Sequence, residues 1–379
     1  MYRLATSTWN EKELEAIQTI IDADMYSMGK YVAEYECEFA GTFGSKYAVM
    51  VNSGSTANLL MIGSLFFRKN NPLKRGDEII VPAVSWSTTY APLQQYGLKV
   101  KFVDIDRETL NLDLDKLEDA ITEDTKAVLA VNLLGNPLDF DRLKKIIGNR
   151  ILLEDNCESM GATYKGKQAG TFGLMGSFSS YFSHHISTME GGCIITDDEE
   201  LYHILLCMRS HGWTRNLPKE NHISNKSDDK FEESFRFVLP GYNVRPLEMS
   251  GAIGLEQLKK LPEFITKRRK NAVLFQQLFS QLPNVEIQKE TGISSWFGFS
   301  LLVKNREKVV KLLEENNIEC RPIVSGNFLK NKELLAHFDY EISGDVSTAE
   351  YIERHGLFVG NSHEDLTDEI TNLFNLLQS

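Results

Sequence analysis

The chain has 379 residues, of which 42% are apolar and 25% charged. This composition is typical of a globular protein with room for one large and one smaller domain. Its 41 basic and 53 acidic residues give a net charge of −12, which argues against non-specific nucleic-acid binding because phosphate would be repelled.

The sequence predicts neither a membrane span nor an export signal. The longest apolar stretch, residues 57–67, is shorter than the roughly 20 residues that a spanning helix needs, and the N-terminal residues lack the apolar core of a signal peptide. The five cysteines are scattered, with no CxxC or CxC pair. We therefore expect a reduced, cytoplasmic protein without membrane contact and without an iron–sulfur cluster.

Short apolar runs alternate with helical patterns through the first two thirds of the chain. The expected strands are Lys46–Val51, Glu78–Val81, Val100–Val103, Ala127–Val131 and Ile151–Leu153. The expected helices are Glu11–Asp22, Thr56–Phe67 and Asp113–Ile121. Nearly continuous apolar runs are typical of strands buried on both faces. The order predicts an α/β fold with a mostly parallel central sheet, and such sheets bind ligands at the carboxyl ends of their strands.

The pattern changes near residue 243. One helix is expected to begin near Leu247 and a longer one to run from Pro262 to about Leu282. Strand-like stretches at Trp296–Val303 and Cys320–Val324 then alternate with helices. We therefore divide the chain into a large domain of residues 1–250 and a small C-terminal α/β domain of residues 251–379.

Residues 52–56, with the sequence NSGST, follow an expected strand and open an expected helix. Free backbone N–H groups and the positive end of the helix dipole suit a phosphate at such a place, and small side chains let it approach. The alternative is an ordinary capped helix start. No GxGxxG motif opens a helix after a strand, so nicotinamide binding is not supported.

Asp155 and Glu158 follow the strand Ile151–Leu153. A carboxylate at the end of a strand can hold a protonated pyridine nitrogen, or it can simply cap a turn. Glu154 is a weaker candidate, because the alternation of a strand turns it to the other face. Trp86 follows the strand Glu78–Val81, where its indole could stack on a flat ring or pack into the core.

The segment Ser177–Gly192 reads SFSSYFSHHISTMEGG and places His184 beside His185. Neighbouring side chains of an extended segment point to opposite faces, and the other histidines lack ligand spacing, so we expect no metal site. An imidazole cannot form a carbonyl adduct, but with an ordinary pKa of about 6.5 it can accept and donate protons. His211, Arg215 and Asn243 could bind an anion or move a proton, or could be surface residues.

Taken in order, the segments NSGSTA, PAVSWST, VDID, EDNCESMGA, SFSSYFSHHISTMEGG, HGW and GYNVRPLEMSGAIG resemble the DegT/DnrJ-type sugar aminotransferases over nearly the whole chain. The resemblance implies the three-layer, aspartate aminotransferase-like fold of the type I pyridoxal phosphate (PLP) enzymes. In that family a lysine that carries the cofactor stands where this chain has His184. The exchange resembles the sugar 3-dehydratases of the same family.

The resemblance also implies a role for each candidate residue. His184 would be the catalytic acid and base. The residues implied to hold PLP or pyridoxamine phosphate (PMP), without a covalent bond, are Gly54, Ser55, Trp86, Asp155, Glu158, Ser179 and Asn243. The residues implied to bind the nucleotide sugar are His211 and Arg215. Asn243, His211 and Arg215 would act across the interface of a homodimer.

The implied reaction removes the C3 hydroxyl of a nucleotide-linked 4-keto-6-deoxyhexose. GDP-4-keto-6-deoxy-D-mannose is the favoured substrate, and its 3,6-dideoxy product leads to colitose for the O-antigen. L-Glutamate would convert PLP into PMP, and water and ammonia would be released. Three alternatives stay open: an iron–sulfur dehydratase, a sugar aminotransferase that uses histidine, and a non-catalytic binder of PLP or a nucleotide sugar. The absence of a CxC pair argues against the first, and Asp155 argues against the third.

Overall fold

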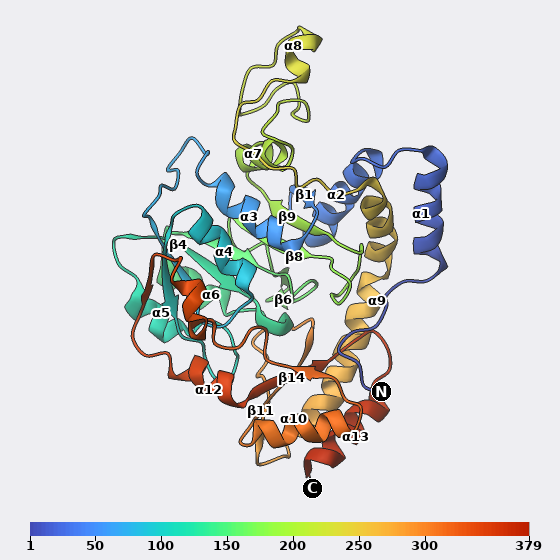
Figure 1. The fold of residues 1–379 in the computed structure, drawn as a ribbon, viewed down its shortest axis with the longest axis vertical. Helices are drawn as coiled ribbons and strands as arrows, with labels where there is room; N and C mark the ends of the chain where they lie inside the picture. Colours follow the sequence, from blue (N-terminus) through green and yellow to red (C-terminus); the bar gives the residue numbers. More distant parts are fainter. Residues whose placement is uncertain (379) are drawn as a thin grey trace.

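An eight-stranded sheet forms the centre of the molecule in the computed structural model, which describes residues 1–378 (Figure 1). Its strand order is β1-β9-β8-β5-β4-β2-β3-β13. The bounds are β1 (Tyr47–Val51), β2 (Glu78–Pro82), β3 (Lys99–Val103), β4 (Thr125–Val131), β5 (Ile151–Asp155), β8 (Met175–Ser179), β9 (Gly192–Thr196) and β13 (Tyr340–Ile342). Only β9 runs against its neighbours, so the predicted mostly parallel sheet is confirmed.

Helices cover both faces of this sheet. The helices of the chain are α1 (Glu11–Ala23), α2 (Lys30–Phe43), α3 (Gly54–Ser64), α4 (Ser87–Gln95), α5 (Leu114–Ala120), α6 (Phe140–Ile147), α7 (Glu199–Arg209), α8 (Lys230–Ser234), α9 (Glu248–Phe279), α10 (Arg306–Glu315), α11 (Lys332–Leu335), α12 (Ser347–His355) and α13 (Thr367–Gln378). Along β4, Ala127 and Leu129 pack with α3, α4 and α7, whereas Val128 and Ala130 pack with α5 and α6. This alternation produces the expected three layers.

Helix α9 corrects one prediction. The sequence predicted a break before Pro262, but α9 is a single helix of 32 residues with Pro262 inside it. A proline in a helix removes one hydrogen bond and costs about 3 kcal/mol. Here Leu258 and Leu261 before the proline, and Phe264 and Ile265 after it, pack into one cluster with α2. This packing holds the helix together across the proline.

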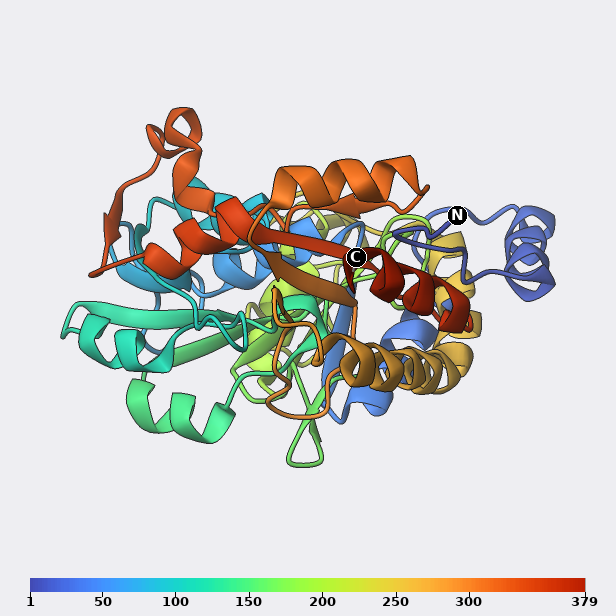
Figure 2. The same cartoon turned by 90° about the horizontal axis from the view of Figure 1, so that it is seen from below.

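A second sheet lies beside the C-terminal half of α9. Its order is β10-β11-β14-β12, with bounds β10 (Val285–Glu286), β11 (Gly298–Val303), β12 (Cys320–Arg321) and β14 (Gly356–Gly360). Phe275 of α9 stacks with Phe299 of β11 and with Phe279 of its own helix, and α13 lies alongside α9 (Figure 2). Strand β13 of this C-terminal region pairs with β3 of the large sheet, and α9 crosses position 250. The division at that residue therefore stays a prediction.

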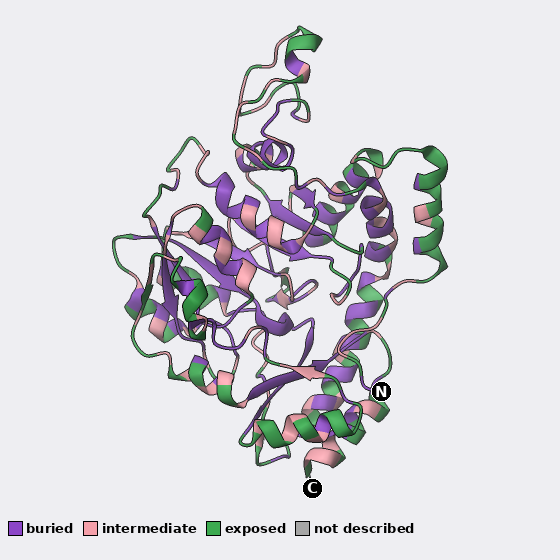
Figure 3. Ribbon diagram, viewed as in Figure 1, coloured by how far each residue is buried: buried purple, intermediate pink, exposed green. Residues whose placement is uncertain are grey.

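The remaining strands, β6 (Thr163–Tyr164) and β7 (Lys167–Gln168), form a small hairpin. Figure 3 shows that the central strands are buried, while α1 and the arm that carries α8 are largely exposed. This arm, residues 211–243, projects from the body of the molecule at the top of Figure 1. Within residues 1–378, no helix is both long and apolar enough to cross a bilayer.

Candidate active site

A pocket of about 450 Å³ lies where β5 and β8 end and α3 and α4 begin. Its volume is in the range of small-molecule sites. Of the residues predicted from the sequence, it is lined by Gly54, Ser55, Trp86, Asp155, Glu158, Ser179 and His184. The strand-end position expected for a binding site is therefore the position of this pocket.

The N-terminus of α3 forms one wall of the pocket. Ser53 caps this helix by accepting a hydrogen bond from the Thr56 N–H at 3.1 Å. The Ser55 hydroxyl lies 2.9 Å from the Thr88 hydroxyl, so hydroxyl groups of α3 and α4 meet at the helix start. Free N–H groups, the helix dipole and hydroxyls together suit a phosphate at this wall.

Gly54 allows the close approach of α3 to β8. A Cβ at this position would lie 2.7 Å from Ser179 Cβ and 2.9 Å from Cys157 Sγ. We expect Gly54→Ala to push these groups apart and weaken binding of PLP, the cofactor that the resemblance implies, about tenfold, which corresponds to about 1.4 kcal/mol. Titration of PLP followed by absorbance measures this change. Gly41→Ala is the matched control, because no atom lies within 4 Å of its added methyl, and it should leave PLP affinity unchanged.

Asp155, the last residue of β5, is held in one orientation. Its Oδ2 accepts hydrogen bonds from Asn58 Nδ2 at 2.9 Å and Thr89 Oγ1 at 2.8 Å. Its Oδ1 accepts one from the Cys157 N–H at 3.1 Å. A carboxylate has about four acceptor positions, so Asp155 can accept a further bond from a molecule in the pocket that it lines.

Glu154 faces the other way, as predicted. It is fully buried and accepts hydrogen bonds from the N–H groups of Gly170 at 2.7 Å and Gly173 at 2.6 Å.

Trp86 lines the pocket with 52% of its surface exposed. The core-packing alternative for Trp86 is therefore wrong, and its indole face is free to contact a flat ring.

Glu158 also lines the pocket, and its Oε2 accepts a hydrogen bond from the Leu134 N–H at 3.1 Å. Burial raises the pKa of Glu158 to about 7, although the charge of Arg321 and this hydrogen bond act in the opposite direction. Near neutral pH the carboxyl therefore exists in both protonation states, and it can donate or accept a hydrogen bond.

This raised pKa predicts a pH dependence of stability. Between about pH 4.5, the ordinary value, and about pH 7, folded Glu158 is protonated while the unfolded chain is ionised, so folding binds a proton. The free energy of unfolding should therefore fall as pH rises through this window, relative to Glu158→Gln. Urea denaturation of both proteins without PLP at several pH values measures the difference. Parallel pH dependences of the two proteins would contradict the prediction.

His184 lines the pocket beside Phe297, with 5.1 Å between the ring centroids and the rings edge to face. Its Nδ1 is buried without a hydrogen-bond partner. Burial, with the positive charges of Arg321 and Arg268, lowers the pKa of His184 to about 3. The pKa of His184 therefore lies well below the ordinary value of 6.5 expected from the sequence, and near neutral pH the ring is neutral. His185 points elsewhere, with its Nε2 3.2 Å from the Ser295 carbonyl oxygen.

A family model described as the DegT/DnrJ/EryC1/StrS aminotransferase family matches residues 7–377. The chain belongs to this family. It is 69% identical over 385 residues to the GDP-4-keto-6-deoxy-D-mannose 3-dehydratase of Yersinia pseudotuberculosis, covering all of this chain and 98% of that one.

Two solved structures are also similar to this member of the DegT/DnrJ/EryC1/StrS family. One is GDP-4-keto-6-deoxymannose-3-dehydratase with a trapped PLP-glutamate geminal diamine, which is 65% identical, with complete coverage of both chains and a TM-score of 0.98. The other is a histidine-to-asparagine mutant of the same enzyme with bound GDP-perosamine, which is 64% identical, with complete coverage of both chains and a TM-score of 0.99. The predicted family and the PLP-enzyme fold are thus confirmed.

Several pocket residues of this family member were missed in the sequence. Asn58 lies on α3 and orients Asp155, but in the sequence it was only one residue of an expected helix. Arg321 reaches the pocket from β12 of the second sheet, and its Nε is buried without a partner. Tyr181, Ser183 and Glu190 also line the pocket. The last three lie in the segment that drew attention to His184, so proximity to that motif was a usable signal, whereas nothing local marked Arg321.

Three predicted residues lie outside the pocket of the single chain. Arg215 is exposed on the arm and donates from Nε and Nη2 to the Ser234 carbonyl oxygen, at 3.2 and 2.7 Å. His211 packs on the Trp213 ring, at 5.0 Å between centroids. Asn243 is exposed and accepts a hydrogen bond from Arg245 Nε at 3.0 Å. Their predicted roles need a second subunit and stay predictions.

Within residues 1–378, no group of three or more His, Cys, Asp or Glu side chains is suited to a metal ion.

Proposed function

We propose that this protein removes the C3 hydroxyl of GDP-4-keto-6-deoxy-D-mannose in a PLP- and L-glutamate-dependent reaction that releases water and ammonia. The observation that carries the proposal is His184 in the pocket wall where most sugar aminotransferases of the family have lysine. The 69% identity to a dehydratase of this specificity supports it along the full chain. The product would supply colitose for an O-antigen.

The residues of the pocket fit PLP. The start of α3 with Gly54, Ser55 and the neighbouring Ser179 forms a cradle for its phosphate. Asp155 is oriented to accept a hydrogen bond from the protonated ring nitrogen, and Trp86 offers an exposed indole face for stacking. Glu158 can share a proton with the ring oxygen. When bound, PLP supplies an electron sink for carbanionic charge, and PMP supplies the amine that engages the sugar ketone.

His184 is proposed as the acid and base. An imidazole cannot anchor a carbonyl compound covalently, so the cofactor is held by contacts alone. The neutral ring would accept the proton lost by the PMP carbon that carries the amine, and the resulting imidazolium would donate it to the departing C3 hydroxyl, which leaves as water. Anions bound nearby raise the pKa of an imidazole, because negative charge stabilises its cation. The phosphate and diphosphate groups of the proposed ligands therefore bring the pKa of His184 upward from about 3.

We further propose a cytoplasmic homodimer in which each arm completes the pocket of the other subunit. Support comes from the exposure of Arg215 and Asn243 away from the pocket of their own chain. The arm also exposes Phe231 and Phe235, with 86% and 67% of their surfaces accessible. Apolar surface of this kind is typical of a contact region.

One experiment tests the substrate. The protein is incubated with PLP, L-glutamate and the GDP-, CDP- or dTDP-linked 4-keto-6-deoxyhexose, and the sugar products are analysed by mass spectrometry. We expect loss of one oxygen from the GDP-linked sugar only. Turnover of a CDP- or dTDP-linked sugar with equal kcat/KM would contradict the proposed specificity.

A further inference from the structure

The loop that carries His184 is fixed at Ser187, three residues further along, by both polar groups of its backbone. The Ser187 N–H donates to Gln257 Oε1 at 2.9 Å, and the Ser187 carbonyl accepts from Trp9 Nε1 at 2.9 Å. Ser187 is only 3% exposed, so water cannot readily replace these bonds. The loop is thereby tied to α9 and to the segment that precedes α1.

No hydrogen bond orients the side chain of His184 through Nδ1, which is buried without a partner. Its ring packs against Phe297 and Tyr181, and its backbone N–H donates to the Tyr181 carbonyl at 2.9 Å. In many enzymes a carboxylate bonded to the second ring nitrogen sets the orientation of a catalytic histidine. Here the position of the ring must follow from packing and from the backbone of its loop.

Gln257 can bind Ser187 in one orientation of its amide only. Its Oε1 accepts from Thr8 Oγ1 at 2.7 Å and from the Ser187 N–H. Its Nε2 donates to Glu13 Oε1 at 2.7 Å and to the Thr8 carbonyl at 3.1 Å. All four hydrogen-bonding positions of the amide are thus used. Since a carboxylate only accepts hydrogen bonds, Glu13 holds the NH₂ group on its own side and directs Oε1 toward Ser187.

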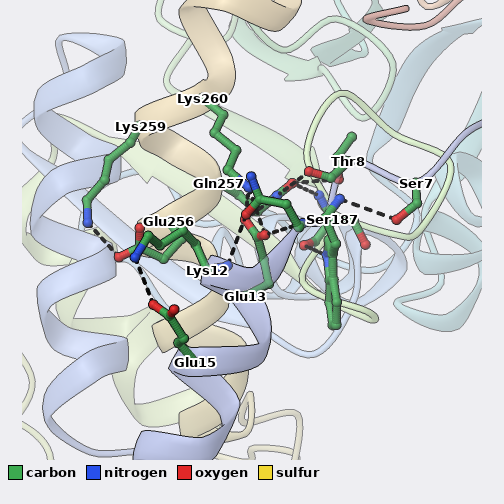
Figure 4. Close-up of polar contacts among 12 residues, drawn as sticks. Ser7, Thr8, Lys12, Glu13, Glu15, Ser187, Glu256, Gln257, Lys259 and Lys260 are labelled. Atoms are coloured by element: carbon green, nitrogen blue, oxygen red, sulfur yellow. Dashed lines mark hydrogen bonds and ion pairs between the residues drawn. The ribbon is translucent and has the colours of Figure 1, made fainter.

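Glu13 lies in the first turn of α1, where its contacts hold the carboxylate in place as a hydrogen-bond acceptor (Figure 4). It is fully buried, its Oε2 accepts from the Asn10 N–H at 2.7 Å, and Lys260 Nζ lies 2.6 and 2.7 Å from its two oxygens. Burial raises the pKa of Glu13, but the hydrogen bonds from Asn10, Lys260 and Gln257 outweigh this effect and lower it overall. Glu13 therefore stays ionised near neutral pH.

We propose that Glu13, Gln257 and Trp9 are positioning residues that set the place of His184 through the backbone of Ser187. The inference rests on the proposed role of His184. An error of about 1 Å in the placement of a reacting group can cost about 100-fold in rate, so a tether of this kind matters for turnover more than for binding.

The test uses two variants of the full-length protein. Glu13→Gln keeps the shape but can donate as well as accept, so it no longer fixes the Gln257 amide. Trp9→Phe keeps an aromatic ring and removes only the N–H that binds Ser187. Glu256→Gln is the matched control, because Glu256 is the neighbour of Gln257 on α9 and its side chain contacts Lys259 instead. Figure 4 shows the contact of Glu256 with Lys259 and the contact of Gln257 with Ser187.

We measure hydrogen exchange of the peptide that covers residues 184–189, in the protein without substrate, together with kcat and KM for the GDP-linked sugar. Both variants should speed exchange of this peptide about tenfold and lower kcat about tenfold or more, while KM, PLP affinity and the melting temperature of Trp9→Phe stay near wild type. Glu256→Gln should match wild type in every measurement.

The inference is overturned if exchange is unchanged in both variants, or if exchange rises while kcat stays at the wild-type value. It is also overturned if PLP affinity and KM deteriorate together with kcat, because that pattern belongs to a general loss of structure. A protein that dehydrates no sugar would refute the proposed function, while the exchange experiment would still report on the tether.

Discussion

Replacing His184 with asparagine should lower kcat for loss of the C3 hydroxyl by about 10²- to 10⁴-fold, the usual contribution of a positioned acid or base. Asparagine is close in size, but it cannot take up the proton that the neutral imidazole accepts. PLP affinity should stay within about threefold of wild type, because the cradle at α3 and the carboxylate of Asp155 are untouched. Ammonia release under saturating GDP-linked sugar measures kcat, and absorbance titration measures PLP binding.

His337→Asn is the matched control. His337 is exposed after α11, outside the pocket, so the same substitution there should leave kcat unchanged. If His184→Asn retains more than about a tenth of the wild-type kcat, another group performs the proton transfer and the proposed mechanism is wrong.

Asp155→Asn should lower kcat by about 10²- to 10³-fold, the scale seen when one preorganised electrostatic group is removed. The amide has the shape of the carboxylate but no negative charge to stabilise a protonated ring nitrogen. It also presents an NH₂ group toward donors, since Asn58 Nδ2 and Thr89 Oγ1 both donate to Asp155 Oδ2. The same assay of ammonia release measures the loss, and the absorbance of bound PLP reports the altered ring.

Asp113→Asn serves as the control for this change. Asp113 caps α5 by accepting hydrogen bonds from the Asp115 and Lys116 N–H groups, and asparagine is an equally good capping residue. Wild-type kcat is expected for this variant. Wild-type kcat in Asp155→Asn would show that the charge of this carboxylate is not needed.

The sequence was sufficient to predict five strands of the central sheet and seven of the residues that line the pocket, because local patterns mark them. Apolar runs marked the central strands, and the end of such a run located Asp155 on the pocket side and Glu154 on the opposite side. The NSGST turn located the start of α3. These signals lie within a few residues of the groups they identify.

What the sequence did not predict depends on distant contacts. Arg321 comes from β12, far along the chain, and lowers the pKa of His184 together with burial. Asn58 acts only because α3 lies beside the end of β5. Pro262 was predicted to begin a helix, but α9 continues through it because residues on both sides of the proline pack on α2. Helix propensities and sequence motifs cannot reveal these contacts, since each involves a residue that only the fold brings close.

The fate of nitrogen tests the central claim most directly. The protein is supplied with PLP, GDP-4-keto-6-deoxy-D-mannose and ¹⁵N-labelled L-glutamate, and the label is followed by NMR and mass spectrometry. We expect the label to appear as free ammonium in step with 2-oxoglutarate, and the sugar to lose one oxygen without gaining nitrogen. An amino sugar that carries the label would instead make the protein an aminotransferase and contradict the assignment of His184 to water loss.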